Sequence, residues 1–74
     1  MQRTLKEWRV HYGYSQEDLA KAINVRPSTI SGWERDPEIM QIKYANRIAK
    51  QFNITLNDII FLSDNRNLLT KREV

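Results

Sequence analysis

The sequence predicts one all-α domain of five short helices. Apolar residues recur at spacings of three and four along most of the chain, and residue types that start or end helices stand at the boundaries of each stretch. No strand pattern is found. Seventy-four residues with 41% hydrophobic content suffice for one small core. We assign residues 1–62 to this domain and residues 63–74 to a C-terminal tail, disordered or associated with dimer formation.

The first helix is expected between Thr4 and Gly13. Thr4 and Glu7 have the spacing of a capping box, in which each side chain bonds to the backbone N–H of the other residue. Glycine readily takes the left-handed conformation that ends many helices. The apolar face of this helix comprises Leu5, Trp8 and Tyr12.

The second helix is expected to begin near Gln16 and to end at Asn24. Ser15 and Asp18 repeat the capping-box spacing, and asparagine is second only to glycine in the left-handed conformation. The residues expected to pack this helix are Tyr14 and Leu19, spaced as a hydrophobic staple, together with Ala20 and Ile23.

A third helix is expected to start at Pro27, because proline at the first helical position loses no hydrogen bond and already has a helical φ. Ile30 and Trp33 then face inward. The opposite side carries small residues, namely Ser28, Thr29, Ser31 and Gly32. Such a face lets the backbone come close to a flat polyanion. The second and third helices, joined by a tight turn, therefore form a helix-turn-helix.

Two more helices are expected after a loop at residues 36–41. The fourth has an amphipathic stripe and ends at Asn53; the stripe consists of Ile42, Ala45, Ile48, Ala49 and Phe52. The fifth is expected to start from Thr55, with Asp58 three residues on as a third capping pair. It is expected to continue through Ile60 toward Leu62.

Residues 5–62 resemble the Xre/Cro-type family, whose members have the lambda-repressor-like DNA-binding domain. The matching residues are Leu5, Arg9, Gly13, Ser15, Gln16, Leu19, Ala20, Ile23, Val25, Ile30, Ser31, Trp33, Glu34, Phe52, Asn53 and Ile54. The departures are Asn24, Asp36, Pro37 and Met40, which concern backbone geometry, and the pair Arg26 and Pro27, where the family commonly has a small cap and a long polar reading residue. Base readout is therefore less predictable for this chain.

The resemblance implies a small stand-alone phage or bacterial transcription regulator. It would be a homodimeric repressor that occupies a pseudo-palindromic operator in double-stranded DNA, with residues 27–35 in the major groove. The base-reading residues would be Arg26, Pro27, Ser28, Ser31 and Gly32, with Arg26 placed to pair with guanine O6 and N7. The contacts to the DNA backbone would be made by Ser15, Gln16, Thr29, Arg35 and Lys43.

Two further pairs of residues are assigned to architecture. The resemblance implies that Arg9 and Glu34 form a buried ion pair between the first and third helices. Phe61 and Leu62 are candidates for a dimer interface, because the apolar run at residues 59–62 exceeds what one helical face can bury.

The residue types and their spacing argue against other classes of protein. The chain has no cysteine, and His11 has no partner at ligand spacing, so no metal or other cofactor is expected. No hydroxyl has an adjacent base, and no glycine-rich phosphate loop is present, so an enzyme is not expected. No apolar run approaches the roughly 18 residues of a membrane span. A net charge of +3 favours polyanionic partners, and we expect a cytoplasmic, nucleoid-associated protein.

A protein-interaction role stays open beside the repressor. An antitoxin or an adaptor can use the same fold with DNA binding secondary, since a fold does not fix a function. A toxin or an anti-repressor would then be a partner. The small polar reading face flanked by arginine favours DNA, whereas tight copurification with a partner protein would favour the alternative.

Overall fold

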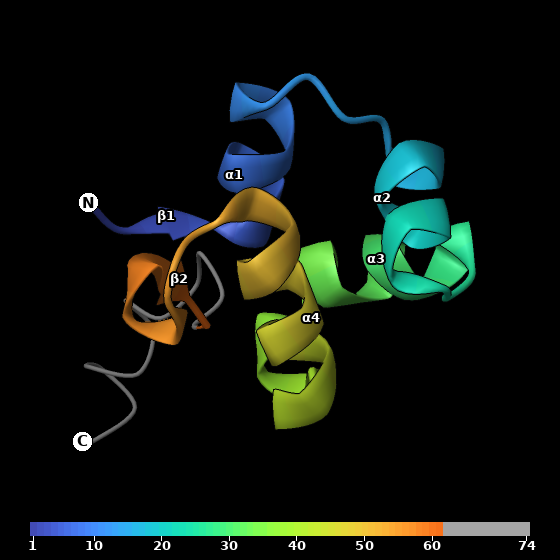
Figure 1. Ribbon diagram of the computed structural model, residues 1–74. Coiled ribbons are helices and arrows are strands. Elements are labelled where there is room, and N and C mark those ends of the chain that lie inside the picture. Colours follow the sequence, from blue (N-terminus) through green and yellow to red (C-terminus); the bar gives the residue numbers. More distant parts are fainter. Residues whose placement is uncertain (62–74) are drawn as a thin grey trace, which may run out of the picture.

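A computed structural model describes residues 1–61 and contains four α-helices and one pair of very short parallel strands (Figure 1). In chain order the elements are β1 (Arg3–Thr4), α1 (Leu5–His11), α2 (Gln16–Ile23), α3 (Pro27–Arg35), the 3₁₀ turn η1 (Pro37–Ile39), α4 (Ile42–Phe52), the 3₁₀ turn η2 (Leu56–Asp58) and β2 (Ile59–Ile60). The expected tail at residues 63–74 and Leu62 lie outside the described residues.

The first two helices begin at the expected capping boxes. The Thr4 hydroxyl accepts from the Glu7 N–H at 3.1 Å, and the Thr4 N–H donates to the Glu7 carboxylate at 2.8 Å. Ser15 and Asp18 exchange the same two bonds, each at 2.9 Å. Because these bonds satisfy N–H groups that lack helical partners, they fix where α1 and α2 start.

The other residues expected at helix boundaries are also confirmed. Pro27 occupies the first turn of α3. Asn24 and Asn53, the residues that end α2 and α4, have left-handed φ values of 62° and 58°. Gly13 has a φ of +77°, a conformation that side-chain-bearing residues rarely adopt, so a glycine is required in the turn after α1.

Two capping carboxylates, those of Asp18 and Asp58, make the stability of the fold depend on pH in the acid range. Hydrogen bonds from the Ser15 N–H and hydroxyl hold the pKa of Asp18 below its ordinary 3.8, and the same two groups of Thr55 lower the pKa of Asp58. A carboxylate with a lowered folded-state pKa stabilises the fold above its unfolded pKa, and this contribution is lost as the pH falls through the folded value.

Asp18→Asn is therefore expected to make thermal stability less sensitive to acid. The melting temperature of the variant should be lower than that of the parent at neutral pH and should approach it between about pH 4 and pH 2. Thermal unfolding followed by circular dichroism across this range measures the difference. Glu17→Gln is the control, because Glu17 lies in the same turn outside the capping box. Parallel curves for Asp18→Asn and the parent would contradict the assignment.

The expected fifth helix is wrong. After the single turn η2, the chain becomes extended, and β2 pairs in parallel with β1, Arg3 opposite Ile59. Side chains from the N-terminal segment take the carbonyls that a longer helix would use: Trp8 Nε1 donates to the Asp58 carbonyl at 2.8 Å, and Gln2 Nε2 donates to the Asn57 carbonyl at 2.9 Å. The β-branched pair at residues 59–60 also favours a strand.

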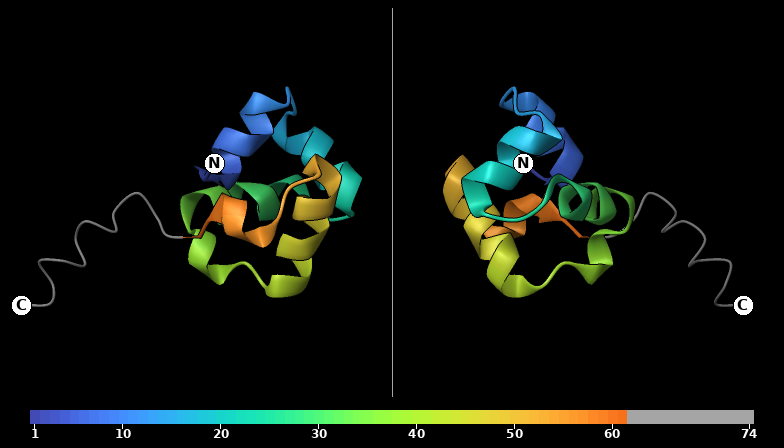
Figure 2. Two further views of the ribbon diagram at one scale, coloured as in Figure 1. Left: turned by 60° about the vertical axis from the view of Figure 1, so that its left-hand side comes forward. Right: turned by 90° about the vertical axis from the view of Figure 1, so that its right-hand side faces the viewer.

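Each α-helix contributes one of the largest fully buried side chains, namely Leu5, Leu19, Ile30 and Ile48. The two tryptophans, Trp8 and Trp33, join this core. The helices surround it from several directions (Figure 2). α2 packs on both α3 and α4, and α3 also contacts α1. Helix α3 is therefore held by α1, by α2 and by the turn η1 that follows it.

Two residues expected on buried faces lie at the surface. Ile42 is 62% exposed, because it is the first residue of α4 and Met40, just before the helix, occupies the core instead. Tyr12 caps the end of α1 and is 46% exposed, with its ring stacked on Phe52 at 5.1 Å between centroids. No helix within residues 1–61 has the length and apolar character needed to cross a membrane.

Candidate nucleic-acid interface

Helix α3 has one buried and one accessible face. Ile30 and Trp33 are buried, and the Trp33 ring lies 5.4 Å from that of Tyr44 on α4. The accessible side consists of Pro27 and Ser28, which are exposed, and of Thr29, Ser31 and Gly32, which are half-buried. The expected base-reading residues of α3 therefore share a side that the core does not cover. The buried pair fixes the rotation of α3 about its axis.

Gly32 is not required for packing within the described chain. A Cβ atom built at Gly32 would meet no heavy atom within 4 Å apart from its chain neighbours and the backbone of its own helix, and the φ of Gly32 is outside the left-handed range. Glycine inside a helix costs about 1 kcal/mol relative to alanine. No neighbour within residues 1–61 therefore accounts for a glycine at this position.

Gly32→Ala is expected to raise the free energy of unfolding by about 0.5–1 kcal/mol, since the position is helical and has free space. If DNA approaches the backbone there, the same variant should lose affinity for its duplex. Asn46→Ala, at an exposed position of α4, is a matched control that should gain stability and keep its affinity. Urea unfolding and duplex titration measure the two effects. Equal affinities for both variants would contradict a close approach at Gly32.

Cationic side chains stand at both ends of α3. Arg26 is the N-cap residue, is exposed, and makes no side-chain capping bond. Arg35 is exposed in the last turn. Lys43 is exposed near the start of α4, with Nζ 5.1 Å from the centroid of the Tyr44 ring. These three cations are accessible to an anionic partner.

The polar start of α2 is held by internal bonds. The Ser15 oxygen accepts from the Asp18 N–H, so this hydroxyl serves the helix cap. Gln16 is half-buried, and its Nε2 donates to Glu34 Oε1 at 3.0 Å. The amide of Gln16 retains one N–H and its carbonyl oxygen for other contacts. The structure thus connects the first residue of α2 to α3 through a side-chain bond that sequence reasoning did not foresee.

Arg9 and Glu34 form the ion pair that the resemblance implies. The Arg9 guanidinium bonds to both carboxylate oxygens of Glu34, with an Nη2–Oε1 distance of 3.2 Å, and its Nη1 donates to the Tyr14 carbonyl at 2.8 Å. The side chains are 11% and 7% exposed. Every buried side-chain nitrogen and oxygen within residues 1–61 has a hydrogen-bond partner. The pair ties α1 to α3 and to the turn before α2.

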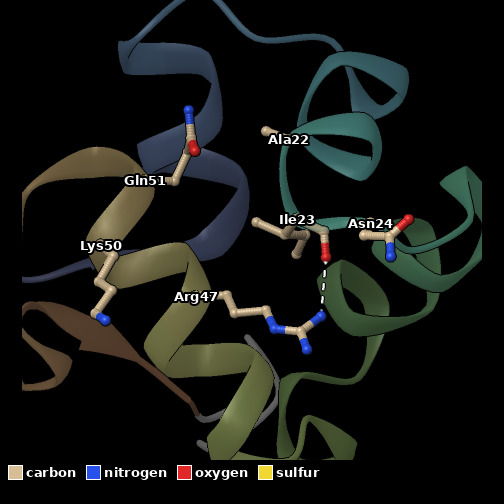
Figure 3. A pocket seen from close by; sticks show the side chains of 6 residues that line it. All are labelled: Ala22, Ile23, Asn24, Arg47, Lys50 and Gln51. Atoms are coloured by element: carbon tan, nitrogen blue, oxygen red, sulfur yellow. Dashed lines mark hydrogen bonds between the residues drawn. The ribbon is translucent and has the colours of Figure 1, made fainter.

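Arg47 makes a contact between α4 and α2 that the sequence did not reveal. Figure 3 shows its guanidinium directed at the end of α2, where Nη1 donates to the Ile23 carbonyl at 3.2 Å. The guanidinium also lies 5.1 Å from the Tyr44 ring centroid. An open pocket of about 390 Å³ surrounds this contact and is lined by Ala22, Ile23, Asn24, Arg47, Lys50 and Gln51. The amphipathic pattern identifies Arg47 as a polar-face residue but cannot show which carbonyl it meets.

Comparisons with known proteins agree with this architecture. A family model described as helix-turn-helix matches residues 5–59. An uncharacterized HTH-type transcriptional regulator of Archaeoglobus fulgidus is 38% identical over 72 residues, which cover 97% of this chain and 100% of that protein. The uncharacterized HTH-type transcriptional regulator YgzD of Bacillus subtilis is 30% identical over 64 residues, covering 86% of this chain and 97% of that protein. The chain belongs to the Xre/lambda-repressor-like helix-turn-helix family of DNA-binding transcriptional regulators.

Proposed function

We propose that the chain is a sequence-specific repressor that inserts α3 into the major groove of an operator. The observation that carries this proposal is the accessible side of α3. This side consists of small residues, no neighbour within residues 1–61 requires a glycine at position 32, and an arginine stands at each end of the helix. A major groove about 12 Å wide admits an α-helix, and small side chains let the helix backbone approach the base edges.

The roles of the polar residues follow from their chemistry. Arg26, at the entry of α3, reads guanine through O6 and N7, while Ser28 and Ser31 read weakly because a hydroxyl both donates and accepts. Pro27 contacts a thymine methyl group. These contacts give sequence preference, because base edges differ in the major groove.

A second set of residues positions the protein on the DNA backbone. Gln16 and the free N–H groups at the start of α2 bind a phosphate; the bond to Glu34 leaves one N–H of the Gln16 amide for this contact. Ser15, Thr29, Arg35 and Lys43 supply the other backbone contacts. Phosphate contacts set affinity and register, and the cationic ones make binding depend on salt.

Repression follows from occupancy by two copies. One short helix reads about one half-site, so a two-fold dimer would read two half-sites about 34 Å apart and exclude polymerase from the covered DNA. Phe61 is half-buried and packs against the core, so part of this residue is accessible for a dimer contact. Leu62 is the other residue proposed for this contact. A cytoplasmic, nucleoid-associated location is part of the proposal.

Selection of bound sequences from random duplex DNA tests the proposal. The expected result is a two-fold symmetric site, bound with an affinity that falls steeply as salt is raised. A protein that enriches no sequence and binds all duplexes alike would overturn sequence-specific repression. Isolation of the tagged chain from its own cells then identifies any protein partner, which is the result expected of an antitoxin or an adaptor.

A further inference from the structure

The open pocket between α2 and α4 is a second cationic surface, separate from the accessible side of α3. Arg47 and Lys50 are exposed on α4, and their spacing of three places them on one face of this helix. α4 has three cations and no acid, and none of these cations forms a salt bridge within residues 1–61. The residues that line the pocket include no carboxylate. The rim of the pocket therefore has an uncompensated positive charge.

The Arg47 guanidinium is held in place by the chain itself. Its Nη1 donates to the Ile23 carbonyl at 3.2 Å, and its Cζ atom lies 5.1 Å from the centroid of the Tyr44 ring. Most N–H donors of the guanidinium remain for a partner, and a carboxylate can accept from them in the bidentate geometry that arginine favours. Because the cation is already fixed, little conformational entropy is lost when an anion binds to it.

The interior of the pocket fits a peptide better than a phosphate backbone. Ala22 and Ile23 give it an apolar wall, which can receive an apolar side chain. Asn24 and Gln51 line it from α2 and α4 (Figure 3), and Gln51 Nε2 is anchored by a 2.8 Å bond to the Tyr14 hydroxyl. A side-chain amide both donates and accepts hydrogen bonds, as a peptide backbone does, whereas a phosphate diester only accepts them. The lining thus matches the groups of a peptide.

The pocket lies away from the side of α3 that we propose to face DNA. The Trp33 ring is buried 5.4 Å from that of Tyr44 on α4, so the accessible side of α3 is turned away from α4. The right-hand view of Figure 2 shows α4 and α3 on opposite sides of the domain. A peptide in the pocket and a duplex on α3 can therefore be bound at the same time.

We infer that this pocket binds a segment of a partner protein in which an apolar side chain is flanked by carboxylates. The apolar side chain packs against Ala22 and Ile23, and the carboxylates bind Arg47 and Lys50 at the rim. The pocket volume of about 390 Å³ is in the range of small-ligand sites, so a short segment fills it. The inference goes beyond the proposed function, because this binding does not require DNA.

The first test titrates the full chain with a synthetic peptide that has one leucine between two pairs of glutamates. Amide chemical shifts should change at residues 22–24 and 47–51, and the affinity should fall as salt is raised. A peptide with glutamine in place of each glutamate, and another with alanine in place of leucine, should each bind at least about fivefold more weakly. No shifts, shifts centred elsewhere on the domain, or equal binding of either control peptide would overturn the inference.

Variants at the rim test the two cations. Lys50→Gln should weaken binding of the glutamate peptide by about fivefold and leaves the bond to the Ile23 carbonyl in place. Arg47→Gln should weaken it at least as much, and its melting temperature is measured alongside because this variant also removes that bond. Lys6→Gln is the matched control, since Lys6 is likewise an exposed helical lysine but lies on α1. Unchanged binding by both rim variants, or an equal loss with Lys6→Gln, would contradict the assignment.

Titration with duplex DNA separates the pocket from a further DNA contact. Lys50→Gln should keep the affinity of the parent for duplex within about twofold, and the glutamate peptide should bind equally well when duplex is present. Displacement of the peptide by duplex, together with a larger loss of duplex affinity in Lys50→Gln, would show that the pocket contacts phosphates and would overturn the inference. Sequence selection by α3 is measured without the peptide, so the proposed function stands or fails separately.

Discussion

Glu34→Gln is expected to lower the free energy of unfolding by about 3 kcal/mol, a large share of the stability of a domain this small. The variant leaves the Arg9 guanidinium in a site where its side chain is 11% exposed and has no counter-charge. The substitution also replaces the carboxylate that accepts the hydrogen bond from Gln16 Nε2 by an amide, which is a weaker acceptor. Urea unfolding at neutral pH measures the loss, and the same variant in the presence of operator DNA should regain part of it through binding.

The double variant Arg9→Met with Glu34→Leu separates the cost of a stranded charge from the value of the pair. Replacing a buried ion pair by apolar residues of similar volume is often close to neutral. Recovery should be partial, because the Tyr14 carbonyl and the Gln16 amide both lose a partner. If Glu34→Gln were as stable as the parent, the pair would not tie α1 to α3 in solution.

Arg26→Ala is expected to cost about 1–3 kcal/mol of binding free energy, or roughly 5–150-fold in affinity, at the selected operator. The loss should be confined to sequences with guanine at one position of each half-site, so that selection with the variant yields a relaxed preference there. Its physical cause is the paired N–H groups of the guanidinium, which match guanine O6 and N7.

Two control variants distinguish recognition of a base from general electrostatic attraction to DNA. Arg26→Lys keeps the charge but loses the planar fork, so it should relax the base preference while retaining most of the salt dependence. Arg35→Ala should weaken binding to all sequences alike and reduce the slope of log affinity against log salt by about one. If Arg26→Ala behaved like Arg35→Ala, Arg26 would be a phosphate contact and the base-reading assignment would be wrong.

Local signals predicted most of the helices. Capping pairs at Thr4 and Ser15, Pro27 at the start of α3, and the left-handed Asn24 and Asn53 are short-range features, so a reader of the sequence can locate them. The order of elements from α1 to α4 follows from them. These residues act through their own neighbours along the chain, which is why no knowledge of the tertiary structure is needed.

The errors arose where distant segments compete for the same backbone groups. Thr55 and Asp58 have a helix-starting pattern, yet the bond from Trp8 to the Asp58 carbonyl and the pairing of β2 with β1 end the helix after one turn. The bonds from Gln16 to Glu34 and from Arg47 to Ile23 were missed for the same reason. Ile42 has the spacing expected of a buried helical residue, but it is exposed, and Met40, two residues earlier, is buried in the core instead.

In the proposed complex, the accessible side of α3 meets DNA. Amide chemical shifts of the full chain, recorded while the selected duplex is added, test it most directly. The largest changes are expected at Gln16, at Arg26 and along residues 28–32, with small changes at the pocket around Arg47 and at the exposed face of α1. Changes centred on that pocket or on α1, with α3 unaffected, would contradict the claim.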